Sequence, residues 1–190
     1  LVAAAIVPGS SILLREVGIN PTRTGLLEVL SAMGAKLELA NQRCVAGEFA
    51  ADIRLTAAPL KAVSVGGDTV VRMIDEFPAL AIAACFADGV TEVRDAEELR
   101  YKETDRISVL CAELRALGVS LEERQDGFAV TGGTIRGGAC DARGDHRLAM
   151  SLALAGLAAP SPVLVRNAAI LNESFPAFLP TLRALGVRDH

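Results

Sequence analysis

Two short patterns occur three times along this 190-residue chain, and the repetition constrains its fold more than any other feature. One pattern ends a candidate strand and reads Leu14-Arg15-Glu16-Val17, Val93-Arg94-Asp95-Ala96 and Val165-Arg166-Asn167-Ala168. The other ends a candidate helix and reads Ser31-Ala32-Met33-Gly34, Arg115-Ala116-Leu117-Gly118 and Arg183-Ala184-Leu185-Gly186. Three copies at a period of roughly 70–80 residues predict one α/β domain with pseudo-threefold symmetry.

Local sequence patterns predict the strands and helices within each repeated unit, which is of a βαβαββ type. Hydrophobic alternation and turn residues predict strands at 10–17, 36–39, 52–56, 62–65, 90–94, 119–122, 128–131 and 162–166. Apolar periodicity predicts helices at 26–33, 73–87, 98–117, 145–158 and 175–185. The Ala- and Leu-rich helices that begin at Asp75 and Asp145 have little polar surface, so we expect buried helices with sheets outside them. The first unit is expected to be incomplete, without this helix.

Composition excludes several classes of protein. Aromatic residues make up 4% of the chain, Trp is absent and the net charge is −4, which argues against a nucleic-acid partner. No apolar run reaches the roughly 18 residues of a membrane span. The first residues include neither Met nor a charged segment before the apolar run, so they do not resemble a signal peptide and suggest a cut within a longer protein.

The cysteines are widely spaced and few His residues accompany them. Cys44, Cys85, Cys111 and Cys140 form no C-x-x-C pair, and the chain has two His. Neither a metal site nor a disulfide framework fits this spacing. We therefore expect reduced, mostly buried thiols in a cytoplasmic protein, with no metal bound.

The stretch from Glu98 to Ile107 carries the strongest functional signal. On a helix at about 100° per residue, Lys102, Glu103 and Arg106 fall on one arc beside the N-terminus, where backbone N–H groups favour an anion. The repeat brings equivalent helix N-termini to one end of the domain, which adds Asp75 and Arg147 to the same face. These residue types predict a site that holds a phosphate or carboxylate and transfers a proton beside it.

Structural roles remain open for the same residues. Asp75 and Asp145 are also suited to cap helices. Glu103 is also placed to pair with Arg106 without proton chemistry, and Arg147 to neutralise a neighbouring carboxylate. We interpret His146 as structural.

Five stretches resemble the enolpyruvyl transferase family, and within it the 3-phosphoshikimate 1-carboxyvinyltransferases (EPSP synthases). They are Asn20 to Gly25, Ile74 to Pro78, Leu99 to Ile107, Gly144 to Met150 and Ser174 to Pro176. The matches run in family order over nearly the whole chain, and the part from Arg100 to Ile107 is the most specific. The resemblance implies a two-domain enzyme with its active site between the domains. Residues 1–190 would be the C-terminal domain, with the N-terminal domain absent from this chain.

The resemblance also implies an activity. The family transfers the enolpyruvyl group of phosphoenolpyruvate to the 5-hydroxyl of shikimate 3-phosphate and releases phosphate, in aromatic amino-acid biosynthesis, without a metal or organic cofactor. Asp75 would contact the shikimate hydroxyl as a base, and Glu103 would protonate the methylene carbon of phosphoenolpyruvate and later remove that proton. Lys102 would bridge the charges of the two substrates. Arg106 and Arg147 would bind phosphoenolpyruvate.

One position departs from the family pattern. Many members have a Lys before the Ser/Thr-Phe-Pro stretch that contacts phosphoenolpyruvate, and this chain has Glu173 there. That substitution leaves the contact, and sensitivity to glyphosate, open.

Two other functions fit the sequence. The sister enolpyruvyl transferase that acts on UDP-N-acetylglucosamine shares the architecture, although the stretch from Arg100 to Ile107 favours the shikimate enzyme. A non-catalytic α/β module that binds an anion or a partner domain also describes the chain. Without opposing cations from a second domain, we expect the isolated chain to be inactive.

Overall fold

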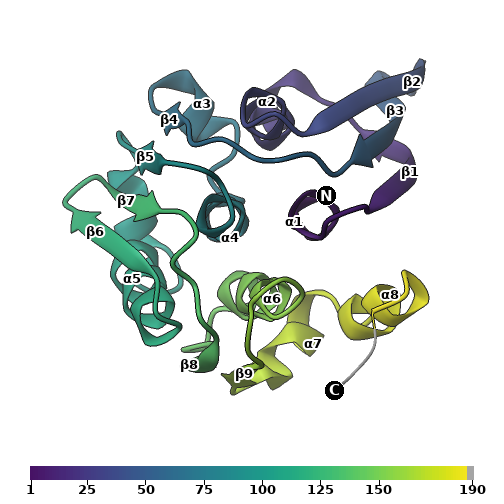
Figure 1. The fold of residues 1–190 in the computed structure, drawn as a ribbon. Helices are drawn as coiled ribbons and strands as arrows, with labels where there is room; N and C mark the ends of the chain where they lie inside the picture. The colour runs from purple at the N-terminus through teal and green to yellow at the C-terminus, as the bar shows by residue number, and fades with distance from the viewer. Residues whose placement is uncertain (188–190) are drawn as a thin grey trace.

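The computed structural model describes residues 1–187 and confirms an α/β fold of three related units. Helices α1, α4 and α6 lie toward the middle of the molecule, and the strands lie outside them (Figure 1). The prediction of buried helices with outer sheets is therefore confirmed.

The elements follow one another as three consecutive groups. The first group contains α1 (Val2–Ile6), β1 (Ser11–Gly18), η1 (Pro21–Arg23), α2 (Gly25–Ala32), β2 (Lys36–Val45) and β3 (Glu48–Thr56). The second contains β4 (Ser64–Val65), α3 (Asp68–Val71), α4 (Phe77–Cys85), β5 (Val90–Val93), η2 (Glu97–Tyr101), α5 (Arg106–Ala116), β6 (Ser120–Arg124) and β7 (Gly127–Thr131). The third contains β8 (Gly138–Asp141), α6 (His146–Ala155), β9 (Val163–Arg166), η3 (Ala168–Ile170), α7 (Leu171–Ser174) and α8 (Phe178–Ala184).

Each group forms its own sheet. The first sheet has the order β1-β3-β2 and is antiparallel. In the second, of order β4-β5-β7-β6, β4 runs parallel to β5 and the remaining pairs are antiparallel. The third pairs β8 with β9 in parallel. The predicted hairpin at Asp126-Gly127 joins β6 to β7 and is confirmed.

The backbone repeats with the sequence. The residue after each of the repeated arginines, Arg15, Arg94 and Arg166, has a positive φ, which is 58° at Glu16, 60° at Asp95 and 55° at Asn167. Each of these residues is hydrogen-bonded to an aspartate of its own unit. Asp52 accepts from the backbone N–H of Glu16 and Asp126 from that of Asp95, both at 2.9 Å, whereas Asp141 accepts from the side-chain Nδ2 of Asn167 at 2.8 Å. Non-glycine residues adopt this left-handed conformation uncommonly, so its recurrence is independent support for the threefold repeat.

Helix α4 is enclosed on nearly every side. Eight of its nine residues are buried, including Phe77, Leu80 and Ile82 at 0% exposure. It packs against both α1 and α6, so the core runs between the units instead of lying inside any one of them. This packing aligns the elements that carry the candidate site.

Helix α4 begins later than predicted. A helix was expected from residue 73, but Met73 to Glu76 form a turn and α4 begins at Phe77. The ring of Pro78 would clash with the carbonyl of Ile74 if the helix extended backward. Pro78 lies in the first turn as expected, whereas Asp75 precedes the helix.

The helix predicted over 98–117 is broken. Residues Glu97–Tyr101 form the 3₁₀ helix η2, and α5 begins at Arg106 after an irregular segment. Asp105 causes the new start, because its side chain accepts a hydrogen bond from the backbone N–H of Ser108 at 3.0 Å. The expectation that Lys102, Glu103 and Arg106 share one helical arc is therefore wrong.

Three smaller expectations were also wrong. The first unit does contain a helix in the position expected to be empty, since α1 is present and buries Val2, Ala4, Ala5 and Ile6. Strand β8 was not predicted, because its Gly-rich start reads as a turn and only pairing with β9 makes it a strand. The last helix begins at Phe178 instead of Phe175, since Phe175 precedes a proline and is not helical (φ −141°, ψ 75°).

Candidate active site

Arg106 and Asp145 form the centre of the candidate site. Arg106 is the first residue of α5, and Asp145 is the N-cap of α6. Arg106 Nε donates to Asp145 Oδ2 at 2.8 Å, and the two side chains are 1% and 0% exposed. A charge this deeply buried requires a partner, and each of these residues provides one for the other.

Asp145 has a second task at the start of α6. Its Oδ1 accepts hydrogen bonds from the backbone N–H groups of Arg147 at 2.8 Å and Leu148 at 3.1 Å. The helix-cap interpretation is therefore confirmed for Asp145, whose carboxylate also anchors Arg106. It is wrong for Asp75, because the N-cap of α4 is Glu76. Sequence reasoning missed the contact between Asp145 and Arg106, because no local pattern pairs residues so distant in the chain.

Further carboxylates surround the guanidinium of Arg106. Nη2 donates to Glu103, and Nη1 lies 3.9 Å from Asp75 Oδ1. Among the described residues, Nη1 has no hydrogen-bond partner although it is buried. A buried donor without a hydrogen-bond partner destabilises the fold, and an acceptor atom of a bound ligand would remove that cost.

Asp75 joins the two arginines. Its Oδ2 accepts from Arg147 Nη2 at 3.0 Å, while its Oδ1 faces Arg106. Four of the five residues predicted from the sequence (Asp75, Glu103, Arg106 and Arg147) are therefore gathered in one cluster. The cluster lies where α4, α5 and α6 begin, as the repeat predicted.

Lys102 does not join this cluster. Its ammonium pairs with Glu98, four residues earlier. No contact described within residues 1–187 connects it with the other four. Lys102 is the C-cap of η2 and pairs with a residue of η2, whereas Glu103, the next residue, pairs with Arg106 at the start of α5.

The side chains of the cluster differ in exposure: Arg106 forms a buried floor, and Asp75, Arg147 and Glu103 form a partly exposed rim above it. Arg106 is 1% exposed, whereas the side chains of Asp75, Arg147 and Glu103 are 26%, 34% and 47% exposed. Two carboxylates and one guanidinium therefore reach solvent above a buried cation. This arrangement can bind an anion and exchange a proton with it at the rim.

Glu76 adds a titratable group next to Asp75. Burial raises the pKa of the Glu76 carboxyl above its ordinary value, and the neighbouring charge of Asp75 raises it further, while Arg147 and Arg23 oppose the shift. The cluster thus has one carboxyl that takes up a proton more readily than an exposed glutamate. Sequence reasoning did not single it out.

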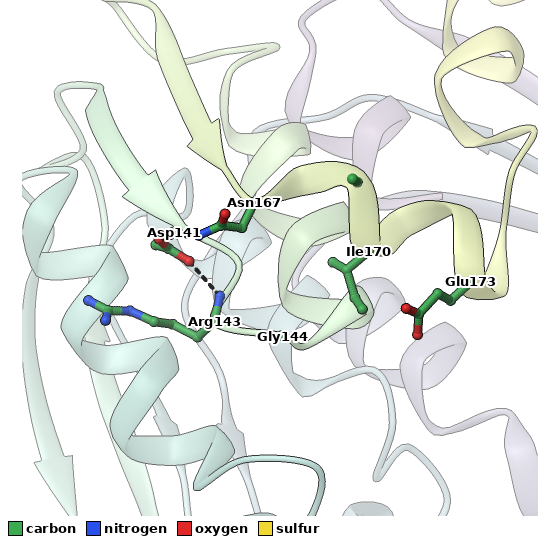
Figure 2. Close-up of a pocket in the computed structure, with 7 residues that line it drawn as sticks. Asp141, Arg143, Gly144, Asn167, Ile170 and Glu173 are labelled. Atoms are coloured by element: carbon green, nitrogen blue, oxygen red, sulfur yellow. Dashed lines mark hydrogen bonds between the residues drawn. The ribbon is translucent and has the colours of Figure 1, made fainter.

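Glu173 lines a separate open hollow of about 590 Å³. Figure 2 shows Arg143 and Glu173 on opposite sides of it, with Asp141 and Asn167 along one edge. Arg143 Nε donates to Glu113 at 2.8 Å. The carboxylates of Asp141 and Glu173 repel an anion, and Arg143 is already paired with the carboxylate of Glu113. This hollow is therefore a poor site for an anion.

The described residues offer no group of His, Cys, Asp and Glu that could hold a metal ion. None of the helices within residues 1–187 has the length and hydropathy of a membrane span. The four thiols are free, with Cys85, Cys111 and Cys140 buried and Cys44 exposed.

Comparisons with solved structures define the class to which this fold belongs. The enolpyruvyl transferase NikO from Streptomyces tendae superposes with a TM-score of 0.72 at 23% identity, over 98% of this chain and 41% of that chain, which shows a shared fold. An EPSP synthase from Acinetobacter baumannii superposes with a TM-score of 0.94 at 40% identity, over 97% of this chain and 44% of that chain. The architecture is that of the enolpyruvyl transferases.

Sequence comparisons specify the family. The family described as EPSP synthase (3-phosphoshikimate 1-carboxyvinyltransferase) matches residues 1–182, and the chain belongs to this family. Relatives named 3-phosphoshikimate 1-carboxyvinyltransferase include that of Synechococcus elongatus, 50% identical over 97% of this chain, and that of Geobacter sulfurreducens, 49% identical over 99%. The chain spans 42% and 44% of the length of these two relatives.

Proposed function

We propose that this chain is the C-terminal domain of a two-domain enzyme that transfers the enolpyruvyl group of phosphoenolpyruvate to the 5-hydroxyl of shikimate 3-phosphate and releases phosphate. The observation that carries the proposal is the gathering of Asp75, Glu103, Arg106 and Arg147 at one end of a domain of this family. The remaining half of the protein, an N-terminal domain, would provide the opposite wall of the site.

The reaction adds an alcohol across an enol-phosphate double bond and then eliminates phosphate. The acceptor oxygen bonds to the phosphate-bearing carbon as its proton leaves, and the methylene carbon gains a proton to become a methyl group. Loss of a proton from that methyl group then expels phosphate and restores the double bond. A base at the oxygen and an acid at the carbon are both required.

The geometry supports assigning these roles to Asp75 and Glu103. Both carboxylates are partly exposed, and both lie against Arg106. We assign the base to Asp75 and the carbon acid to Glu103. Lys102, beside Glu103 in the chain, would bridge the charges of the two substrates after leaving Glu98.

The arginines would hold phosphoenolpyruvate in different ways. Arg147 is partly exposed, and its planar guanidinium is suited to a carboxylate or phosphate. Arg106 is buried, but its Nη1 lacks a hydrogen-bond partner among the described residues. A substrate oxygen would accept a hydrogen bond from this Nη1. Binding would require the side chains of Asp75 and Glu103 to move aside from it.

Phosphate release measured on the complete protein tests the proposal. The full reading frame that contains these residues would be expressed and supplied with phosphoenolpyruvate and either shikimate 3-phosphate or UDP-N-acetylglucosamine. We expect phosphate release only with shikimate 3-phosphate, its loss in Glu103→Gln, and no change in the matched variant Glu122→Gln on strand β6. Release with the nucleotide sugar alone would assign the protein to the sister reaction, and release with neither acceptor would contradict the proposal.

The isolated chain is a separate case. Because the opposite wall is missing, we propose that these 190 residues bind phosphate esters weakly and do not turn over. Calorimetry that detects tight binding of both substrates to the chain alone would contradict this. We place the complete protein in the cytoplasm, which the free thiols support.

A further inference from the structure

Arg100 is anchored to a rigid part of the fold outside the cluster. Its Nε donates to the backbone carbonyl of Gln125 at 2.7 Å, and its Nη2 donates to that of Arg124 at 2.6 Å. Both carbonyls lie where β6 turns into β7, and the side chain is 16% exposed. The guanidinium is therefore fixed on the hairpin.

The remaining nitrogen of Arg100 holds the start of α5. Nη1 donates to Asp105 Oδ2 at 2.9 Å and Oδ1 at 3.2 Å. The same Oδ1 caps α5 by accepting from the Ser108 N–H at 3.0 Å. Glu123 Oε1, at 3.3 Å from Nη1 and 3.4 Å from Nη2, balances the charge.

One guanidinium thus holds both ends of the segment from Tyr101 to Thr104. Arg100 itself begins this segment, and Asp105 ends it. Beyond the last residue of η2 the segment has no regular secondary structure, and Tyr101 is 77% exposed. Within it, Lys102 pairs with Glu98 and Glu103 with Arg106, so ion pairs instead of backbone structure restrain it. It carries Lys102 and Glu103. Closing a short loop at both ends restricts the positions its residues can reach.

We propose that Arg100 is a positioning residue, which fixes the segment from Tyr101 to Thr104 so that the Glu103 carboxylate is held for proton transfer. The proposal rests on the proposed function for its catalytic consequence, but the restraint itself is a property of this chain. Arg100 contacts no member of the cluster directly in the described contacts. Its effect passes through Asp105 and the backbone.

A lysine cannot replace Arg100. An ammonium is a single point charge, whereas the flat guanidinium points separate donors at the hairpin carbonyls and at Asp105. Arg100→Lys should therefore retain the charge and lose one of the two attachments.

Hydrogen–deuterium exchange of the full-length protein tests the restraint. We expect Arg100→Met to raise exchange in peptides covering residues 101–108, and Arg100→Lys to raise it less. The matched control is Arg115→Met, because Arg115 Nη1 lies 3.6 Å from Oε2 of the same Glu123 and its contacts do not include the segment. Unchanged exchange in Arg100→Met, or an equal rise in Arg115→Met, would overturn the proposal.

Steady-state kinetics on the same variants test the consequence. Displacing Glu103 should lower kcat by roughly 10- to 100-fold in Arg100→Met. The KM for phosphoenolpyruvate should rise by a smaller factor than kcat falls, because Lys102 moves with the segment whereas Arg106 and Arg147 are held by Asp145 and Asp75 instead of Arg100. Equal kcat in Arg100→Met and wild type would refute the catalytic role. If the wild type itself does not release phosphate, the proposed function fails, while the exchange result still decides the restraint.

Discussion

Arg106 and Asp145 are 39 residues apart in the chain and form a buried ion pair, with Nε 2.8 Å from Oδ2. The pair joins the first residue of α5 to the N-cap of α6. It therefore connects the second unit of the fold with the third at the point where the exposed members of the cluster gather. The geometry of the candidate site depends on this contact.

Removing the Asp145 carboxylate should destabilise the fold. Asp145→Ala removes the fully buried partner of Arg106 and leaves α6 without its cap, so we expect the free energy of unfolding to fall by about 3–5 kcal/mol. Asp145→Asn keeps an efficient cap, and we expect it to recover about 1 kcal/mol of that loss. Denaturant unfolding measures both. Wild-type stability in Asp145→Asn would show that Glu103 and Asp75 suffice to balance Arg106.

Asp75→Asn should separate activity from stability. The ion pair between Asp75 and Arg147 is partly exposed, so its loss should cost no more than about 1 kcal/mol. Removing the proposed base should lower kcat by about 100-fold or more. Phosphate release and thermal unfolding of the full-length protein measure the two effects. Asp88→Asn, at the other end of α4, is the control and should alter neither. A large loss of stability with retained kcat would make Asp75 a structural residue.

The raised pKa of Glu76 predicts how stability depends on pH. A carboxyl whose pKa is higher in the folded state than its unfolded value of about 4.5 binds its proton more tightly when folded, so its contribution to stability is lost as pH rises through the folded pKa. Glu76→Gln cannot ionise. It should have a higher Tm than wild type at pH 7 and an equal Tm at pH values below the unfolded pKa. A lower Tm at pH 7 would contradict the desolvation argument.

Thiol reactivity should follow burial. Desolvation raises the pKa of Cys85 and Cys111 to about 12 and that of Cys140 to about 11, whereas Cys44 is exposed. Of the four thiols in these 190 residues, a thiolate-specific reagent at pH 8 should therefore modify Cys44 alone in the native state and all four in denaturant. Cys44→Ser should abolish the native reaction. Rapid modification of a second thiol in the native state would show that a buried cysteine becomes accessible.

Local sequence patterns predicted most elements but placed several boundaries incorrectly. The strand at 11–18 and the hairpin at 126–127 were recovered, because alternation and an Asp-Gly turn are local signals. Strand β8 was missed, because its four residues become a strand only by pairing with β9. The helix at 98–117 was wrongly drawn as continuous, since the capping side chain of Asp105 outweighed the helical pattern on either side of it.

The sequence by itself determined that three related units are present and that charged residues begin several of their helices, because repeats and charges are written in the order of residues. From these features alone the prediction placed Asp75, Lys102, Glu103, Arg106 and Arg147 together at one end of the domain. Only the tertiary structure decided which charges are buried and which partners they have. Arg106 became the enclosed floor of the cluster and Lys102 stayed outside it, because burial and ion pairing depend on how α4, α5 and α6 pack together.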